Sequence, residues 1–236
     1  MKRKDKAYNT LNPRCAKGDK PKVPQDNNRV IISGSVSGQA EFDHELHGEK
    51  FYILPVDIPR LSGVVDTLPL TVAESLMPDG LPEPGEHVTV RGQLRSYNKR
   101  IDDVNRLIIT VFAKQYRVEN TSMRDFINDI SLTGYICKPV AYRTTPFMRE
   151  IADILLAVNR AYGKSDYLPC IAWGRNARFA GQMPVGKLIR LDGRIQSRVY
   201  QKLLEDGASV ERTAYEVSAS YLEFADETGL FHGNMI

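Results

Sequence analysis

The chain repeats itself with an offset of one hundred residues, and this constrains the fold more than any other feature. Residues 28–73 align with residues 128–173 without a gap, and after one inserted residue GEHVTVRGQLRS at 85–96 aligns with GKLIRLDGRIQS at 186–197. A repeat of this period predicts two similar structural units of about ninety to a hundred residues. The identities in the ungapped part are Asn28/Asn128, Gly34/Gly134, Arg60/Arg160, Gly63/Gly163, Asp66/Asp166, Leu68/Leu168 and Pro69/Pro169.

The repeat divides the chain into five segments. We expect a basic, disordered N-terminal arm at 1–27, a first unit at 28–119, a connector at 120–127, a second unit at 128–225 and a short tail at 226–236. Residues 1–29 contain nine Lys or Arg and three Asp, a net charge of +6, which leaves about −3 for the rest of the chain. Such an arm either attracts a polyanion or only keeps the chain soluble, and the sequence leaves both interpretations open.

The cysteines and the apolar pattern indicate a cytoplasmic protein. Cys15, Cys137 and Cys170 are widely spaced and include no CxxC pair that would suggest a zinc site or a disulfide framework. The basic start is not followed by the apolar region of a secretory signal, and no run approaches the roughly 20 apolar residues of a membrane span. We therefore expect no contact with a membrane.

Catalytic motifs are absent from the sequence. It contains neither the Gly-x4-Gly-Lys-[Ser/Thr] phosphate loop nor the Gly-x-Ser-x-Gly nucleophile motif. The cluster DHELHGE at 43–49 offers metal-ligand side chains, but His44 and His47 do not have the HExxH spacing, so a surface hairpin loop is the better interpretation. We predict that the protein is not an enzyme and holds no metal or cofactor.

Hydrophobic residues alternate with period two through most of each unit, which predicts β-strands. In 187–200, Ile189, Leu191, Ile195 and Val199 are expected to face inward, with Gly193 bending the strand around a barrel corner. The strands predicted in the second unit are 130–136, 151–158, 168–173, 187–200 and 215–224, with a short helix at 176–183 after the third. This order predicts an all-β chain with short helices, built from two tandem OB-folds, each a five-stranded Greek-key barrel.

The second unit combines exposed aromatic and basic residues. Tyr167 and Trp173 are six residues apart and so share one face of the third strand, because Leu168, Cys170 and Ala172 occupy the inward positions. A single Trp in a strand is usually core, and a single Arg is usually part of a solvated face. Together, however, aromatic faces and a basic stripe are what single-stranded nucleic acid requires. The basic candidates for the phosphate backbone on this reading are Arg160, Lys164, Arg190, Arg194 and Arg198.

Residues 128–224 resemble the OB domain of bacterial and phage single-stranded DNA-binding proteins. The resemblance rests on NDISLTGYI, ILLAVNRAY, DYLPCIAWGRNA, GKLIRLDGRIQSRVY and RTAYEVSASYLEF as the five strands in order. It implies that aromatic residues stack on bases at Tyr162, Tyr167, Trp173 and Tyr200. It also implies that Arg175 in WGRNA, together with Arg194 and Arg198 in GRIQSR, contacts the nucleic-acid backbone. It further implies binding of single-stranded DNA in replication, recombination, repair or mobile-element transfer, and four OB-folds working together. Two OB-folds per chain would then make a homodimer, with replication or recombination proteins as further partners.

The first unit lacks all four aromatic residues. Ser62, Thr67, Ala73 and Lys99 stand at the positions of Tyr162, Tyr167, Trp173 and Tyr200. We therefore expect the second unit to provide the main binding surface and the first to serve assembly, electrostatics or partner contact. Two alternatives stay open: a paired-OB scaffold for a primosome or conjugation protein, and a protein that binds single-stranded RNA, because stacking does not distinguish the sugars.

Overall fold

The computed structural model describes residues 26–101, 104–119, 125–203 and 209–225. The arm up to residue 25, residues 120–124 of the connector and the tail from residue 226 lie outside the described residues. The first unit contains β1 (Asn28–Val36), β2 (Glu41–Leu46), β3 (Glu49–Pro59), β4 (Val65–Ala73), the 3-10 turn η1 (Glu74–Leu76), β5 (His87–Ile101) and β6 (Val104–Val118). The second contains β7 (Ile127–Ile136), β8 (Ala141–Thr144), β9 (Glu150–Asn159), the 3-10 turn η2 (Ala161–Gly163), β10 (Ser165–Trp173), α1 (Arg175–Ala180), β11 (Leu188–Leu203) and β12 (Ser209–Phe224).

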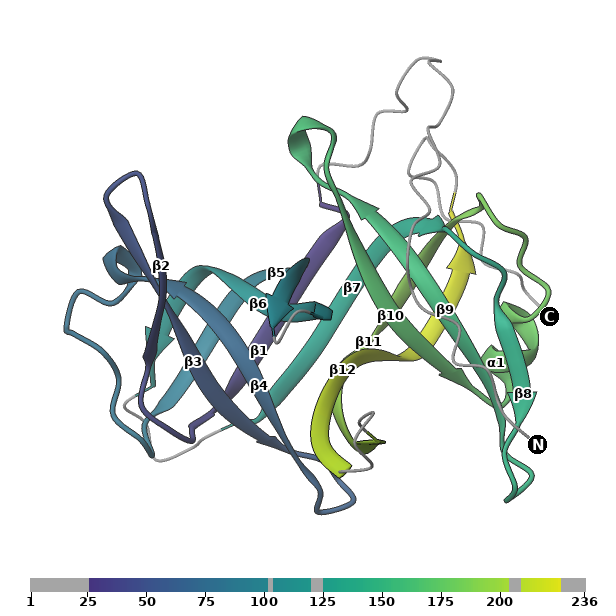
Figure 1. The fold of residues 1–236 in the computed structure, drawn as a ribbon, viewed down its shortest axis with the longest axis horizontal. Coiled ribbons are helices and arrows are strands. Elements are labelled where there is room, and N and C mark those ends of the chain that lie inside the picture. The colour runs from purple at the N-terminus through teal and green to yellow at the C-terminus, as the bar shows by residue number, and fades with distance from the viewer. Residues whose placement is uncertain (1–25, 102–103, 120–124, 204–208, 226–236) are drawn as a thin grey trace.

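Strands β1 and β7 join the two units into one twelve-stranded sheet. Its order is β2-β3-β4-β6-β5-β1-β7-β11-β12-β10-β9-β8, so each unit forms one half. β1 and β7 run antiparallel, and Val30 lies opposite Ile130, its own counterpart in the repeat. An approximate twofold axis therefore passes between these residues, at the two joined strands near the centre of Figure 1.

Each half of the sheet closes into a barrel because its first strand pairs a second time. β7 pairs with β9 at Tyr135 and Ile136 in addition to its pairing with β1 and β11, and β1 pairs with β3 in the same way. The approach is close: a Cβ on Gly134 would lie 2.6 Å from the carbonyl oxygen of Ala157, so glycine is required there. The two closed barrels confirm the predicted tandem OB-folds.

Each barrel contains one strand more than the five predicted. β2 and β8 are exposed edge strands that pair with β3 and β9. The segment 43–49, which we expected to be a hairpin loop, therefore lies mostly in strands, and its turn consists of His47 and Gly48, both with positive φ. Helix α1 covers Arg175–Ala180 and ends earlier than the predicted 176–183, while unit one has only η1 at this place.

Strand β11 bends at the predicted glycine but extends further than expected. The register to β12 shifts between Asp192 and Gly193, where a Cβ would lie 2.2 Å from the carbonyl oxygen of Ser218. The prediction that Val199 faces the core was wrong, because 57% of it is exposed. Beyond Ser197 the β11–β12 hairpin leaves its own barrel and curves toward unit one, as Figure 1 shows.

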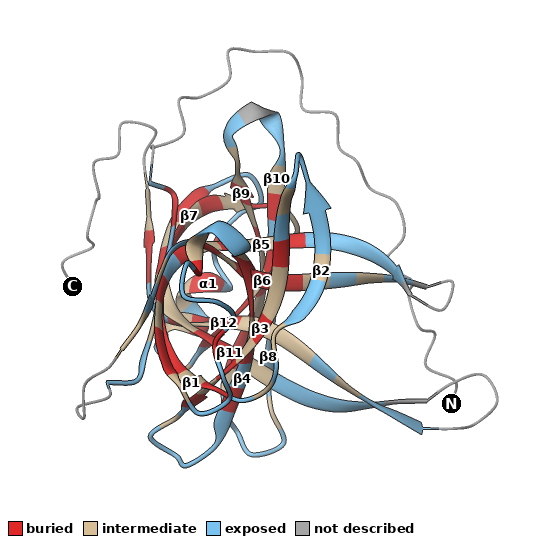
Figure 2. Cartoon of the chain, turned by 90° about the vertical axis from the view of Figure 1, so that its left-hand side faces the viewer, coloured by how far each residue is buried: buried red, intermediate tan, exposed pale blue. Residues whose placement is uncertain are grey.

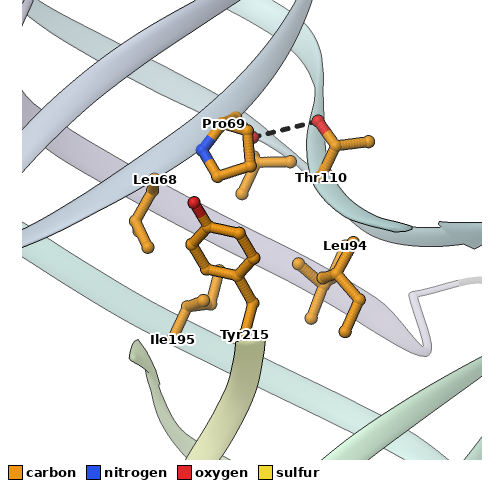
Figure 3. A pocket seen from close by; sticks show the side chains of 8 residues that line it. Leu68, Pro69, Leu94, Thr110, Ile195 and Tyr215 are labelled. Atoms are coloured by element: carbon orange, nitrogen blue, oxygen red, sulfur yellow. Dashed lines mark hydrogen bonds between the residues drawn. The ribbon is translucent and has the colours of Figure 1, made fainter. Parts of the chain in front are cut away.

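The buried residues, red in Figure 2, lie on strands of both barrels and form one hydrophobic cluster. Val56 of β3 and its repeat counterpart Leu156 of β9 are both fully buried. The two cores meet in an apolar seam between the units, where Tyr215 of β12 packs against Pro69 of β4 (Figure 3). The hydroxyl of Thr110 donates to the carbonyl oxygen of Pro69 at 2.9 Å within this seam. Burial, together with the charge of Asp66, raises the pKa of Tyr215.

Two reciprocal clasps hold the units together across the twofold axis, and the first is centred on Asp66. This fully buried carboxylate accepts from Nε and Nη2 of Arg60 at 2.7 and 2.5 Å. It also accepts from the backbone N–H and the hydroxyl of Ser197 in the other unit, at 2.7 and 2.9 Å. Burial alone would raise the pKa of Asp66, but the hydrogen bonds from Arg60 and Ser197 outweigh it and lower the pKa below the ordinary value.

The second clasp is centred on Asp166, the repeat counterpart of Asp66. Its carboxylate is fully buried and accepts from the backbone N–H of Ser96 in unit one at 2.6 Å. Arg160 donates two hydrogen bonds to it, and Arg95 of unit one adds a third at 3.0 Å. The Arg and Asp that the repeat preserves are therefore inter-unit contacts.

Candidate nucleic-acid interface

Tyr167 and Trp173 lie on the outer face of β10, as the alternation predicted. Leu168, Cys170 and Ala172 are buried, whereas 44% of Tyr167 and 40% of Trp173 is exposed. Both ring systems are held by a strand that pairs with β9 over its whole length. The alternation is therefore confirmed, and β10 presents two aromatic side chains on the surface of unit two.

The sheet register places a basic residue on the same face. Ile171, which lies between the two aromatic residues on β10, is beside Ser218 of β12, and Ser218 is beside Arg194 of β11. Residues side by side in a sheet share a face, so Arg194 faces the same way as Tyr167 and Trp173. Arg194 is partly exposed and makes no ion pair with any residue that the structure describes.

Unit one fixes the position of Tyr167. The backbone N–H of Tyr167 donates to the hydroxyl of Ser96 on β5 at 2.8 Å, and Ser96 is also part of the Asp166 clasp. The aromatic surface of unit two is therefore positioned by a strand of unit one. Sequence reasoning missed this contact because the repeat shows that Asp166 is preserved but not which residues of the other unit it contacts.

Two further basic candidates stand at the ends of β10. Lys164 is exposed in the turn before the strand, where its carbonyl oxygen accepts from the backbone N–H of Arg160 at 2.7 Å. Arg175 is exposed at the first position of α1, two residues after Trp173. In the described part of the chain, neither side chain has an ion-pair partner.

The structure places Arg160 and Arg190 in contacts within the protein. Arg160 serves the Asp166 clasp, and its Nη2 also donates to the carbonyl oxygen of Ser96 at 3.0 Å. Arg190 pairs with Asp192 at 3.1 Å and lies 4.0 Å from Glu223. These two guanidinium groups therefore already have carboxylate partners: Asp166 of β10 for Arg160, and Asp192 of the same strand with Glu223 of β12 for Arg190.

Tyr200 and Arg198 lie on the part of β11 that extends beyond the barrel. The guanidinium carbon of Arg198 is 5.7 Å from the ring centroid of Tyr200, within cation–π range, and both side chains are exposed. Tyr200 therefore lies on the β11–β12 hairpin, whereas Tyr167 and Trp173 lie on β10. Tyr162 belongs to η2, and its side chain lies outside the described residues.

Unit one fills the equivalent surface in another way. His44, Phe51 and Ala73 lie side by side on β2, β3 and β4. The His44 ring stacks on Phe51 with centroids 4.7 Å apart and 8° between planes, and Phe51 packs against Phe112 at 5.8 Å. Phe51 is buried in this cluster, so this row of unit one presents Ala73 where unit two presents the open aromatic face of Trp173.

The described residues contain no group of His, Cys, Asp or Glu arranged to hold a metal ion. Within the polar cluster 43–49 noticed in the sequence, the side chains of Asp43 and His44 are hydrogen-bonded to each other at 2.8 Å. Among the same residues, no helix is long and apolar enough to cross a membrane.

Comparison with known proteins identifies the family. Residues 127–225 match the model of the single-strand binding protein family. Single-stranded DNA-binding protein 1 of Streptococcus pyogenes is 32% identical over 109 residues, which cover 43% of this chain and 83% of that protein. The single-stranded DNA-binding protein of Clostridium tetani is 33% identical over 42% of this chain and 71% of its own length. The chain belongs to the single-strand binding protein family.

Other members of the single-strand binding protein family are matched over a smaller share of their length. The single-stranded DNA-binding protein of Oceanobacillus iheyensis is 31% identical over 44% of this chain, and the match covers 66% of that protein. The wild-type single-stranded DNA-binding protein of Thermus aquaticus has the same fold over 84% of this chain and 93% of its own, with a TM-score of 0.68 and 20% identity. Both units thus share the fold of a family structure, whereas the sequence match covers unit two.

Proposed function

We propose that the protein binds single-stranded DNA without sequence preference, through base stacking on unit two and phosphate contacts beside it. The observation that carries this proposal is the outer face of β10, where Tyr167 and Trp173 are exposed beside Arg194, which has no ion-pair partner among the described residues. Stacking on an aromatic ring contributes roughly 1–3 kcal/mol per base and accepts every base. Membership of the family supports single-stranded DNA as the ligand.

The phosphate contacts fall to the cations that are free to make them. Lys164, Arg175 and Arg194 are exposed or partly exposed without an ion-pair partner in the described ranges, and Arg198 lies beside Tyr200. Arg160 and Arg190 remain candidates by sequence, but their carboxylate partners make them weaker ones. Single-stranded DNA that follows this surface would pass from Lys164 along β10 to Arg175.

Unit one has a positioning role in this proposal. It holds Tyr167 through Ser96, and its own surface offers Thr67 and Ala73 where unit two has aromatic rings. The clasps and the β1–β7 ladder make it part of the same sheet. Unit one therefore supports the binding surface of unit two and is a weak binder by itself.

The proposal is tested by the fluorescence of Trp173, the only tryptophan in the chain. Titration with oligo-dT at low and high salt should quench the emission strongly, with an affinity that falls steeply as salt rises, because bound phosphates release counterions. Unchanged emission would overturn the proposal. Oligo-U is the matched competitor, and tighter binding of oligo-U would move the ligand from DNA to RNA.

The same proposal includes a homodimer with four OB-folds. Closed twofold association is the commonest oligomer, and the family resemblance implies four folds acting together. Light scattering coupled to size-exclusion chromatography should give twice the chain mass of 26.6 kDa. A mass of one chain at micromolar concentration would contradict the dimer while leaving the binding surface untouched.

A further inference from the structure

The β8–β9 hairpin of unit two ends in an ordered turn that exposes two large apolar side chains. Phe147 is 86% and Met148 is 82% exposed. The turn is closed by the backbone N–H of Thr145 bonding to the carbonyl oxygen of Arg149 at 2.8 Å, and by the Arg149 N–H bonding to the Thr145 hydroxyl at 3.0 Å. Adjacent exposed apolar side chains beside basic residues form a surface that a ligand could cover.

This turn also keeps a costly backbone conformation. Met148 has φ of 57°, in the left-handed region, and the turn of unit one has His47 at φ 54° and Gly48 at φ 81°. A residue with a side chain is disfavoured there by roughly 1–2 kcal/mol. Such strain is concentrated at binding surfaces and needs surrounding contacts to hold it, which the Thr145 bonds provide.

The hairpin adjoins the Trp173 end of the aromatic surface. Arg143, Ile151 and Trp173 lie side by side on β8, β9 and β10 and so share one face. Arg149 precedes Ile151 by two residues, which is about 7 Å along a strand. The backbone N–H of Gly174 also donates to the carbonyl oxygen of Glu150 at 2.9 Å, which ties the base of the turn to the end of β10.

The repeat supplies an internal comparison, because the hairpins have equal length but opposite charge. Residues 41–49 of unit one contain four acidic residues and no Lys or Arg, a net charge of −4, whereas residues 141–149 contain two Arg and no acid, a net charge of +2. The tip reads LHGE at 46–49 and PFMR at 146–149. The unit that has Trp173 thus also has an aromatic, basic tip, and the unit that lacks it has an acidic one.

We propose that the β8–β9 hairpin is a further single-stranded DNA contact, with Phe147 stacking on a base beyond Trp173 and Arg149 holding the adjoining phosphate. The inference rests on the proposed function and extends its surface past the end of β10. Charge complementarity and continuity with the aromatic surface favour nucleic acid over a protein as the occupant. Arg149 has no ion-pair partner among the residues described, whereas Arg143 already pairs with Asp153 at 3.1 Å. In Figure 1 the hairpin extends beyond the barrel at the lower right, open to solvent.

A reporter at the tip tests the proposal directly. In a Trp173→Phe background, Phe147→Trp makes position 147 the only tryptophan, and His47→Trp provides the matched control at the repeat position in unit one. Oligo-dT longer than about 16 nucleotides, the upper site size of one OB-fold, should quench the first reporter and leave the second unchanged. If the tryptophan at position 147 has the same emission with and without oligo-dT, the proposal is overturned. The same result is expected if the hairpin binds a protein partner instead of DNA.

Affinities separate this proposal from the proposed function. Phe147→Ala should weaken binding of long oligo-dT about fivefold, the equivalent of the lower limit for one stacked base. Arg149→Gln should lower the slope of log K against log salt by about 0.7. His47→Ala and Glu49→Gln are the controls and should bind as the wild type does. If wild-type Trp173 is quenched but both hairpin variants bind like the wild type, the hairpin inference fails and the function stands. If wild-type Trp173 is not quenched, the proposed function itself fails.

Discussion

The Asp166 clasp predicts a large loss of stability when its carboxylate is removed. In Asp166→Ala, the guanidinium groups of Arg160 and Arg95 and the backbone N–H of Ser96 all lose their buried acceptor. Breaking a buried ion pair by removing one partner costs about 3–5 kcal/mol. Because both guanidinium groups are partly exposed and can recover some hydration, we expect the lower end, about 3 kcal/mol.

Urea unfolding followed by circular dichroism measures this loss. With a slope of about 3 kcal/mol per molar urea, a loss of about 3 kcal/mol lowers the midpoint by about 1 M. Asp66→Ala should lower it similarly, since the Asp66 clasp has one guanidinium group and two donors from Ser197. Asp57→Ala is the control, because the carboxylate of Asp57 accepts one exposed hydrogen bond, from Thr67, among the described residues. It should change the free energy of unfolding by less than about 0.5 kcal/mol.

A small effect would refute the reasoning. If Asp166→Ala changes the free energy of unfolding by no more than Asp57→Ala does, the clasp does not hold the units together. If Asp66→Ala is costly and Asp166→Ala is not, the two clasps are not equivalent, and the approximate twofold symmetry does not extend to their energetics.

Three further outcomes follow from the same structure. Trp173→Ala should weaken oligo-dT binding by about 1–3 kcal/mol, while Ala73→Trp in unit one should cause no loss; equal losses in a binding titration would contradict the division of labour. Gly193→Ala should lower the free energy of unfolding by about 3 kcal/mol, since its Cβ would meet the Ser218 carbonyl oxygen at 2.2 Å, and a urea midpoint like that of the wild type would contradict the close approach. Because the folded pKa of Asp66 is lowered, its contribution is complete above the ordinary carboxyl pKa of about 3.9 and is lost as pH falls through the folded value. The difference in free energy of unfolding between the wild type and Asp66→Asn should therefore be constant above about pH 5 and shrink below about pH 4. A difference that grows on acidification would contradict the lowered pKa of Asp66.

Much of the fold could be predicted because its causes are local. The alternation on β10 follows from the two-residue period of a strand, which is why the exposure of Tyr167 and Trp173 was predicted correctly. The bend at Gly193 follows from the missing side chain. The repeat predicted two barrels because a folding unit that occurs twice in sequence occurs twice in space.

The missed features depend on contacts that no local pattern encodes. A repeated Asp can bond within its own unit or across to the other, and only the β1–β7 ladder decides that Asp166 meets Ser96. Val199 follows the alternation of an inward residue, but the strand has left its barrel by then. The repeat shows that the two hairpins have opposite charge. That difference becomes relevant to binding only because the sheet register places Arg143 of β8 on the same face as Trp173.

The central claim is that single-stranded DNA lies on the outer face of unit two, and zero-length crosslinking tests it most directly. Oligo-dT carrying a photoreactive halogenated uracil should, on irradiation, attach to Tyr167 and Trp173 when the crosslinked peptides are mapped by mass spectrometry. Both are exposed aromatic side chains on β10 and are the closest partners that stacking would provide. Crosslinks that map mainly to β3, β4 or β5 of unit one, with β10 unlabelled, would contradict the account.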